Sequence, residues 1–231
     1  MVSLTGVLSA ARHVLLDFDG PVASVFAGYP APEVAQHLHD FLSKEGGSLP
    51  ADWAAESDPL ALLRAVADQR PAHTVAADAY LGQLEGEAVK VAAPTPGGES
   101  LLQACRETRR TVWIVSNNAT AAIAAYLAAH DLEGQVAGVF GRVPGDPASM
   151  KPNPRLLLDA LAAAGAAPSG AVFIGDAVRD VEAGAAAGVA TIGYANKPHK
   201  DQKLRAAGAV AVTDSMLAIA QAVTEAGPLR D

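Results

Sequence analysis

The sequence contains one cysteine, few aromatic residues and no long uninterrupted apolar run. Because Cys105 is the only thiol, no disulfide can form within the chain, and a reducing, cytoplasmic location is expected. The Ala-rich segments are broken by Asp, His and Gly, so none of them is expected to span a membrane. Residues 1–12 lack the cationic start of a signal peptide, and no such peptide is expected.

Basic residues are also scarce. There are 17 Lys and Arg against 25 Asp and Glu, which gives a formal net charge of −8. An acidic chain without a basic run argues against a nucleic-acid partner. A phosphorylated substrate would then have to be attracted locally, by a metal ion and a few cations. Nothing in the sequence specifies the oligomeric state.

Half of the residues are hydrophobic, which is enough for a sizeable core, and they are arranged in an alternating pattern of segments. Short Val- and Ile-rich segments, typical of buried strands, are separated by helical patterns. This alternation predicts a doubly wound parallel sheet with helices on both faces, an α/β Rossmann-like core. The expected strands are the start of 13–22, then 111–115, 136–140, 172–174, 189–192 and 209–212. The expected helices are 99–109, 119–130, 154–164, 179–187, 201–207 and 215–226.

A long segment between the first two strands does not fit this alternation. It contains helical patterns at residues 32–42, 59–68 and 72–89, with no convincing strand, and it is too long for an ordinary loop. We therefore expect residues 23–92 to form an all-helical cap domain inserted after the first core strand. The catalytic core would comprise residues 1–22 and 93–231.

The first apolar run, which begins at His13, ends on Asp17-Phe18-Asp19-Gly20. Ligands of open α/β sheets bind at the carboxyl ends of the strands, where these acids would lie. Residues two apart in an extended segment share a face, so both carboxylates can point into one site. An exposed acidic turn is the alternative interpretation of this segment alone.

Three later motifs favour the site. Ser116-Asn117 follows the second strand, Lys151 precedes a proline-initiated helix, and Gly175-Asp176 is followed four residues later by Asp180. In this order the four motifs resemble those of the haloacid dehalogenase-like (HAD) hydrolase superfamily, over nearly the whole chain. The resemblance points to the branch with a helical cap, similar to phosphoglycolate phosphatases and beta-phosphoglucomutases.

The resemblance implies a phosphatase that forms an aspartyl-phosphate. Asp17 would be the nucleophile, and Asp19 would act first as general acid and then as general base. The substrate would be a small phosphorylated metabolite. Proline at position 21, where the family commonly has Thr, removes a backbone donor and a hydroxyl and stiffens the chain toward the cap.

The resemblance also implies a Mg²⁺ ion. Its ligands would be Asp17, Asp176 and the backbone carbonyl of Asp19. Asp180 would support the metal's water shell or orient Lys151, and its spacing from Asp176 would place both on one helix face. The phosphoryl oxygens would be bound by the side chains of Lys151 and Ser116, the backbone N–H of Asn117, and Gly20.

Several of these residues have simpler interpretations. Ser116 and Asp176 could cap the helices that follow them, Lys151 could be a solvated loop lysine, and Asn118 could replace Asn117 after a small shift. Phe26 and Tyr29 are candidates for the lining of the substrate pocket, with hinge packing as the alternative.

Four other functions are alternatives to a phosphatase. A phosphomutase would use the same residues, whereas a haloacid dehalogenase would leave Asp19 and the metal ligands without a role. A phosphonate-cleaving hydrolase would need a cap lysine, for which Lys44, in a Gly-flanked turn, and Lys90, near the hinge, are weak candidates. A non-catalytic protein that binds a phosphometabolite would show affinity without turnover.

Overall fold

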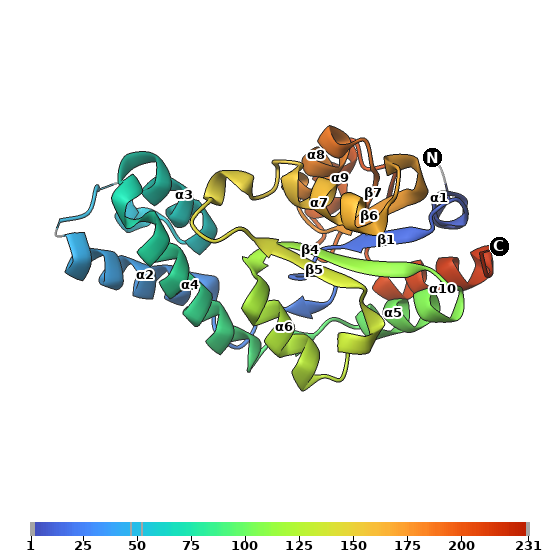
Figure 1. Cartoon of the computed structure of the whole chain (residues 1–231), viewed down its shortest axis with the longest axis horizontal. Coiled ribbons are helices and arrows are strands. Elements are labelled where there is room, and N and C mark those ends of the chain that lie inside the picture. Colours follow the sequence, from blue (N-terminus) through green and yellow to red (C-terminus); the bar gives the residue numbers. More distant parts are fainter. Residues whose placement is uncertain (1–2, 47, 52, 230–231) are drawn as a thin grey trace.

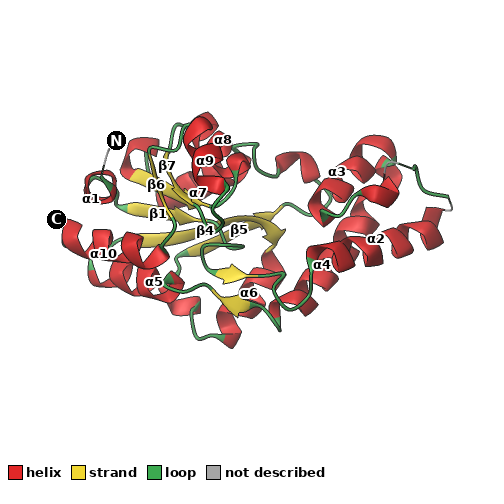
Figure 2. Ribbon diagram, turned by 180° about the vertical axis from the view of Figure 1, so that it is seen from behind, coloured by secondary structure: helices red, strands yellow, loops and turns green. Residues whose placement is uncertain are grey.

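The computed structural model describes residues 3–46, 48–51 and 53–229. Its core is a six-stranded parallel sheet with the strand order β5-β4-β1-β6-β7-β8, in which β1 is central (Figures 1 and 2). This confirms the predicted α/β core. The strands are β1 (His13–Leu16), β4 (Thr111–Ala119), β5 (Gly138–Arg142), β6 (Ala171–Gly175), β7 (Ala190–Tyr194) and β8 (Ala211–Thr213).

The central strand shows why the sheet is covered on both faces. Val14 and Leu16 pack into one hydrophobic cluster, and Leu15 packs into a second cluster on the opposite face. All three side chains are fully buried. A strand buried on both faces reads as a continuous apolar run, as parallel strands do.

Helices form the outer layers of the core. On one face lie α1 (Leu4–Ser9), α5 (Gly98–Glu107), α6 (Thr120–Ala129) and α10 (Met216–Ala226); on the other lie α7 (Arg155–Ala164), α8 (Val178–Ala187) and α9 (Lys200–Ala206) (Figure 1). Within the described ranges, no helix has both the length and the apolar character needed to cross a membrane.

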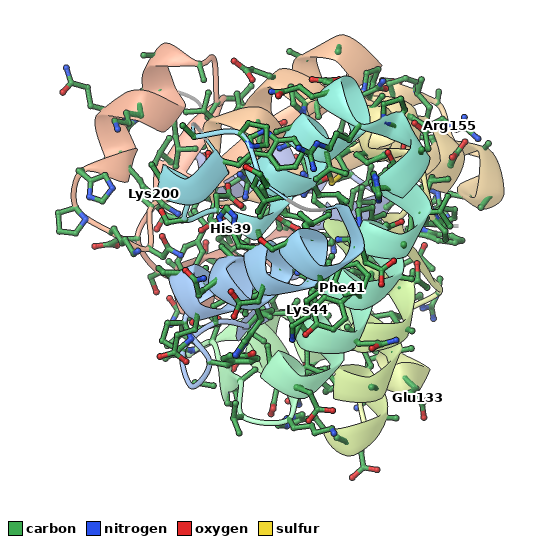
Figure 3. All side chains as sticks on the ribbon, turned by 90° about the vertical axis from the view of Figure 1, so that its left-hand side faces the viewer. His39, Phe41, Lys44, Glu133, Arg155 and Lys200 are labelled. Carbon is green, nitrogen blue, oxygen red and sulfur yellow. The ribbon has the colours of Figure 1, made fainter. Side chains whose placement is uncertain are left out.

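The inserted helices form a separate cap beside the sheet (Figure 1). They are α2 (Ala31–Gly46), α3 (Pro59–Gln69) and α4 (Thr74–Val89), which enclose a hydrophobic cluster of their own. Phe41 of α2, labelled in Figure 3, stacks on Tyr80 of α4 with ring centroids 4.4 Å apart. Met150, from the core, also packs into this cluster.

A two-stranded antiparallel ribbon connects the cap to the core. It pairs β2 (Ala23–Ser24) with β3 (Ala93–Pro94). The sequence predicts only loops at these two places, so the ribbon is a difference from the expectation. The ribbon holds side by side the two segments through which the chain enters and leaves the cap. The domain boundaries at 22/23 and 92/93 lie next to it and stay a prediction.

Other differences are local. The sequence pattern does not predict the short helix α1; its first turn is capped by Ser3, and Leu8 anchors it in the core. Strand β1 ends at Leu16, so Asp17 and Asp19 lie in the following loop rather than in the strand. Short 3-10 turns add to the regular elements, at Trp53–Ala55, Pro71–His73, Glu133–Gln135, Pro147–Ser149 and Pro168–Gly170.

Candidate active site

The site lies at the carboxyl end of the sheet, beginning with the loop after β1. The N–H of Asp17 still donates to the carbonyl of Ile174 in β6, at 2.9 Å, so the sheet holds its backbone. The carboxylate of Asp19 accepts the N–H of Val25 at 3.0 Å. Both carboxylates line one pocket, as the sequence predicts.

Lys151 is fully buried at the centre of this site. Its Nζ lies 2.9 Å from Oδ1 of Asp17 and 2.7 Å from Oδ1 of Asp180. It also donates to the carbonyl of Val115 at 3.0 Å. The interpretation of Lys151 as a solvated loop lysine is therefore wrong.

The structure corrects the predicted relation between Asp176 and Asp180. Helix α8 begins at Val178, so Asp176 lies before the helix and the two residues do not share a helix face. Oδ2 of Asp180 instead turns back and accepts the N–H groups of Asp176, at 3.1 Å, and Ala177, at 2.9 Å. Asp180 thus caps the helix and contacts Lys151, whereas Asp176 does not cap it.

Ser116, Asn117 and Asn118 form an irregular segment near the end of β4, where its register with β5 shifts. Ser116 Oγ donates to Oδ1 of Asn118 at 3.1 Å and does not cap α6, which has no side-chain cap. Asn117 bonds to both backbone groups of Lys151: its Nδ2 donates to the carbonyl at 3.1 Å, and its Oδ1 accepts the N–H at 2.8 Å. All three line the pocket.

Burial dominates the electrostatics of the acids. It raises the pKa of Asp17 to about 7, with further raising by Asp180 and Asp176, although the Lys151 ammonium opposes the shift. Burial also raises the pKa of Asp19 to about 6, against the lowering effect of its bond from Val25. For Asp180 burial again acts to raise the pKa, but the ion pair and hydrogen bond with Lys151, the nearby Arg179 and the N–H of Ala177 together outweigh it, and the pKa of Asp180 is lowered.

The acids also suit a divalent cation. Carboxylate oxygens of Asp17, Asp176 and Asp180 lie within 4.8 Å of one another. Hard oxygen donors of this kind are those that Mg²⁺ prefers. A cation already contacts one of them, because Lys200 donates to Oδ2 of Asp176. The donor set therefore fits a magnesium ion.

Lys200 and Asn196, which follow β7, are two site residues that the sequence analysis missed. The Nδ2 of Asn196 donates to Oδ2 of Asp176 at 2.8 Å, beside the Lys200 contact. Figure 3 labels Lys200, on the core. Their position in the sequence could have indicated them, because polar residues just beyond the carboxyl end of a parallel strand reach the same edge of the sheet as Asp176.

Gly20 has a steric role in the structure. With φ at +108°, it lies so close to Asp176 that a Cβ atom would be 2.7 Å from that residue's Cγ. Its N–H donates to the carbonyl of Ala23 at 2.8 Å. Phosphate binding by Gly20 stays a prediction, while the close packing against Asp176 is observed.

The pocket has a volume of about 170 Å³ and lies between core and cap. Of the two candidates for the pocket lining, Phe26 lines it, whereas Tyr29 lies outside the lining formed by the described residues and contacts His37; both also pack against the hydrophobic clusters of core and cap. Arg179, also missed from the sequence, lines it from the core, 4.0 Å from Asp58 of the cap. The complete lining is Asp17, Asp19, Phe26, Ala31, Asp58, Pro59, Leu60, Ser116, Asn117, Asn118, Lys151 and Arg179.

The two lysines considered for phosphonate cleavage lie elsewhere. Lys44 is in the last turn of α2 rather than in a separate turn, and it is exposed (Figure 3). Lys90 pairs with Glu87 at 2.7 Å on the surface. Among the described residues, the pocket lining contains neither of them.

Comparison with known proteins places this geometry in a family. A search of curated proteins finds no match. Solved structures with the same fold include a predicted phosphatase from Clostridium acetobutylicum, with a TM-score of 0.72, 16% identity and coverage of 93% of this chain and 99% of the other. A predicted phosphoglycolate phosphatase from Haemophilus somnus 129PT has a TM-score of 0.65 and 17% identity, and the match covers 92% of this chain and 97% of the other. A provisionally named beta-phosphoglucomutase from Bacteroides vulgatus has a TM-score of 0.64 and 22% identity, and the match covers 94% of this chain and 90% of the other.

The family model of the haloacid dehalogenase-like hydrolases matches residues 11–188. That span runs from β1 to the end of α8 and includes all four motifs. The chain therefore belongs to the haloacid dehalogenase-like hydrolase family.

Proposed function

We propose that this hydrolase is a Mg²⁺-dependent phosphatase that cleaves a small phosphomonoester through an aspartyl-phosphate on Asp17. The observation that carries the proposal is the position of Lys151. Its ammonium is fully buried between Asp17 and Asp180, and it lines a pocket with Asp19, Ser116 and Asn117. The proposed nucleophile, a second acid and a cation thus line one small pocket.

The two acids suit the two halves of the reaction. A carboxylate oxygen of Asp17 bonds to phosphorus as the bond to the leaving alkoxide breaks, and the carboxyl group of Asp19 donates its proton to that alkoxide. Asp19 then accepts a proton from the water whose oxygen attacks phosphorus, which releases phosphate and restores Asp17. A pKa of about 6 allows Asp19 to take both forms near neutral pH.

The remaining residues hold the phosphoryl group. Lys151, the hydroxyl of Ser116 and the N–H of Asn117 are the proposed donors to its oxygens. Asp17, Asp176 and the carbonyl of Asp19 would hold the magnesium ion, with Asp180 in support. When bound, this ion would supply the positive charge that lets a phosphate approach several carboxylates.

The pocket favours a small substrate. Its volume of about 170 Å³ is below the usual range for drug-sized ligands, and cap residues Phe26, Asp58 and Leu60 cover it. We therefore expect a soluble phosphorylated metabolite rather than a phosphoprotein or a nucleic acid. A cytoplasmic location stays a prediction.

The direct test is phosphate release from a panel of small phosphomonoesters, with and without Mg²⁺, using Asp17→Asn as the blank. The proposal predicts metal-dependent release that the variant abolishes. Transfer between sugar hydroxyls without net release would indicate a phosphomutase instead. Saturable binding without any product would indicate a binding protein, and either result would overturn the proposal.

A further inference from the structure

A buried ion-pair network joins the cap to the core beside the proposed phosphate site. Arg142, at the end of β5, pairs through Nε with Asp78 at 2.6 Å. Its two terminal nitrogens donate to the two carboxylate oxygens of Glu85, at 2.9 and 3.1 Å. Asp78 and Glu85 both belong to cap helix α4, and Arg142 and Glu85 are almost completely buried.

The same network reaches the irregular segment after Val115. Oε2 of Glu85 accepts the N–H of Ala119 at 2.9 Å, and Oε1 accepts from Nδ2 of Asn118 at 3.2 Å. Arg142 donates to the carbonyl of Asn117 at 2.8 Å. A cap carboxylate and its arginine thus bond to three consecutive residues of the segment that contains Asn117.

From Asn117 the connection continues to the catalytic lysine. The amide of Asn117 bonds to both the N–H and the carbonyl of Lys151. Arg64, on cap helix α3, donates to the same Lys151 carbonyl at 2.9 Å. The backbone positions of both proposed phosphate-binding segments therefore depend on bonds that begin in the cap.

An ion pair that only held the cap on the core would not need these bonds to the backbone of residues 117–119. The register of β4 with β5 shifts between Val115 and Ala119, so the regular pairing of the two strands is interrupted over this segment. Glu85 supplies an acceptor for the N–H of Ala119 within that interval. Burial makes these bonds strong and makes an unpaired partner costly.

We propose that Glu85, with Arg142, is a positioning residue for the phosphate-binding segment 116–118, and that α4 stays docked on the core throughout turnover. The inference rests on the proposed function, because it assigns the phosphate to that segment.

The first test is substitution of Glu85 by Gln, compared with Glu87→Gln. Glu87 is on the same helix, but its side chain is 64% exposed and pairs only with Lys90 among the described residues. At a temperature where both variants are folded by circular dichroism, Glu85→Gln should raise KM and the inhibition constant of inorganic phosphate about tenfold, and Glu87→Gln should change neither. Unchanged values in folded Glu85→Gln would overturn the positioning role.

A second test does not require that substitution to fold. A Cβ built on Gly82 of α4 would lie 3.5 Å from Cβ of Ala119, a separation suited to a disulfide. In the Gly82→Cys/Ala119→Cys double variant, the oxidised protein should keep at least half the kcat of the same protein after reduction. A loss of tenfold or more that reduction reverses would show that α4 must undock.

These outcomes are separate from failure of the proposed function. If the wild-type protein released no phosphate, the proposed function would fail first. If the wild type were active but the oxidised double variant were not, only the inference would fail. Failure of the cysteine pair to oxidise would show that α4 does not rest on Ala119 in solution, and would equally overturn it.

Discussion

Lys151 and Asp180 form the most deeply buried ion pair of the site, with Nζ and Oδ1 2.7 Å apart and both residues 0% exposed. The other oxygen of Asp180 accepts two N–H groups at the start of α8. One carboxylate thus fixes the position of the lysine and of the loop that carries Asp176. Lys151, which we propose binds the phosphoryl group, is thus held by the same carboxylate that caps helix α8.

Asp180→Asn should therefore reduce kcat without removing any proposed reacting group. Loss of the charge would leave the ammonium of Lys151 with Asp17 as its ion-pair partner and the carbonyl of Val115 as a neutral acceptor, and supporting residues of this kind are worth roughly tenfold to a hundredfold in activity. Steady-state kinetics with a small phosphomonoester measure the effect. Asp159→Asn, which removes an exposed acid paired with Arg155, is the control and should be neutral. Equal kinetics in the two variants would contradict the role of Asp180.

The raised pKa of Asp17 predicts a pH-dependent stability in metal-free buffer. Since the pKa is about 7 in the folded protein and roughly 4 when unfolded, the folded state binds more protons between these values. Stability is therefore present at low pH and is lost as pH rises through this window. Asp17→Asn removes that dependence.

The measurement is the melting temperature of Asp17→Asn and of the wild type at pH values below and above this window. We expect the variant to gain several degrees relative to the wild type at the higher pH, on the scale of a few kcal/mol. Asp40→Asn, at an exposed helical position, provides the comparison. A difference between variant and wild type that does not change with pH would rule out the raised pKa.

Gly20→Ala should displace Asp176. The new Cβ would lie 2.7 Å from Cγ of that residue, and φ at +108° strains any side chain. We expect the apparent affinity for Mg²⁺ to fall by about tenfold, with a loss of about 1 to 3 kcal/mol in the free energy of unfolding. Activity titrated with Mg²⁺ and thermal unfolding measure the two effects.

Gly134→Ala is the matched control, because a Cβ there meets no atom within 4 Å and its φ is not positive. It should retain both metal response and stability. If Gly20→Ala also kept its Mg²⁺ response and its stability, the close approach of Gly20 to Asp176 would not be needed for metal binding or folding.

Lys200→Met should strengthen metal binding. The ammonium of Lys200 contacts Oδ2 of Asp176 and repels an incoming cation, so its removal takes away that repulsion and leaves the neutral amide of Asn196 bonded to this oxygen. We expect a severalfold fall in the Mg²⁺ concentration needed for half-maximal activity, with Lys203→Met, exposed on the same helix, unchanged. Weaker metal binding in Lys200→Met would show that Lys200 assists the ion rather than competing with it.

The core could be predicted because its strands are buried on both faces. Runs such as Val172-Phe173-Ile174 can be recognised without tertiary information, and parallel strands bring their carboxyl ends to one edge. This is why Asp17, Asp176 and Lys151 meet although they are far apart in the chain. The family resemblance then assigned a role to each.

Other features depended on three-dimensional contacts. The four-residue spacing of Asp176 and Asp180 suggested one helix face, but the helix starts two residues after Asp176 and the second acid turns back as its cap. The partnership of Arg142 with Glu85 joins residues of the core and the cap, 57 positions apart, and no local pattern marks it. The contact of Lys200 with Asp176 could not be predicted either, because Lys200 begins a short polar helix with no distinctive motif.

The most direct measurement is to stop the wild-type enzyme with acid during turnover and locate the phosphoryl group by peptide mass spectrometry. The account predicts a phosphorylated peptide containing Asp17, formed only with Mg²⁺ and substrate and absent from Asp17→Asn. Steady phosphate release with Asp17 unmodified, or a phosphoryl group on another side chain, would contradict it.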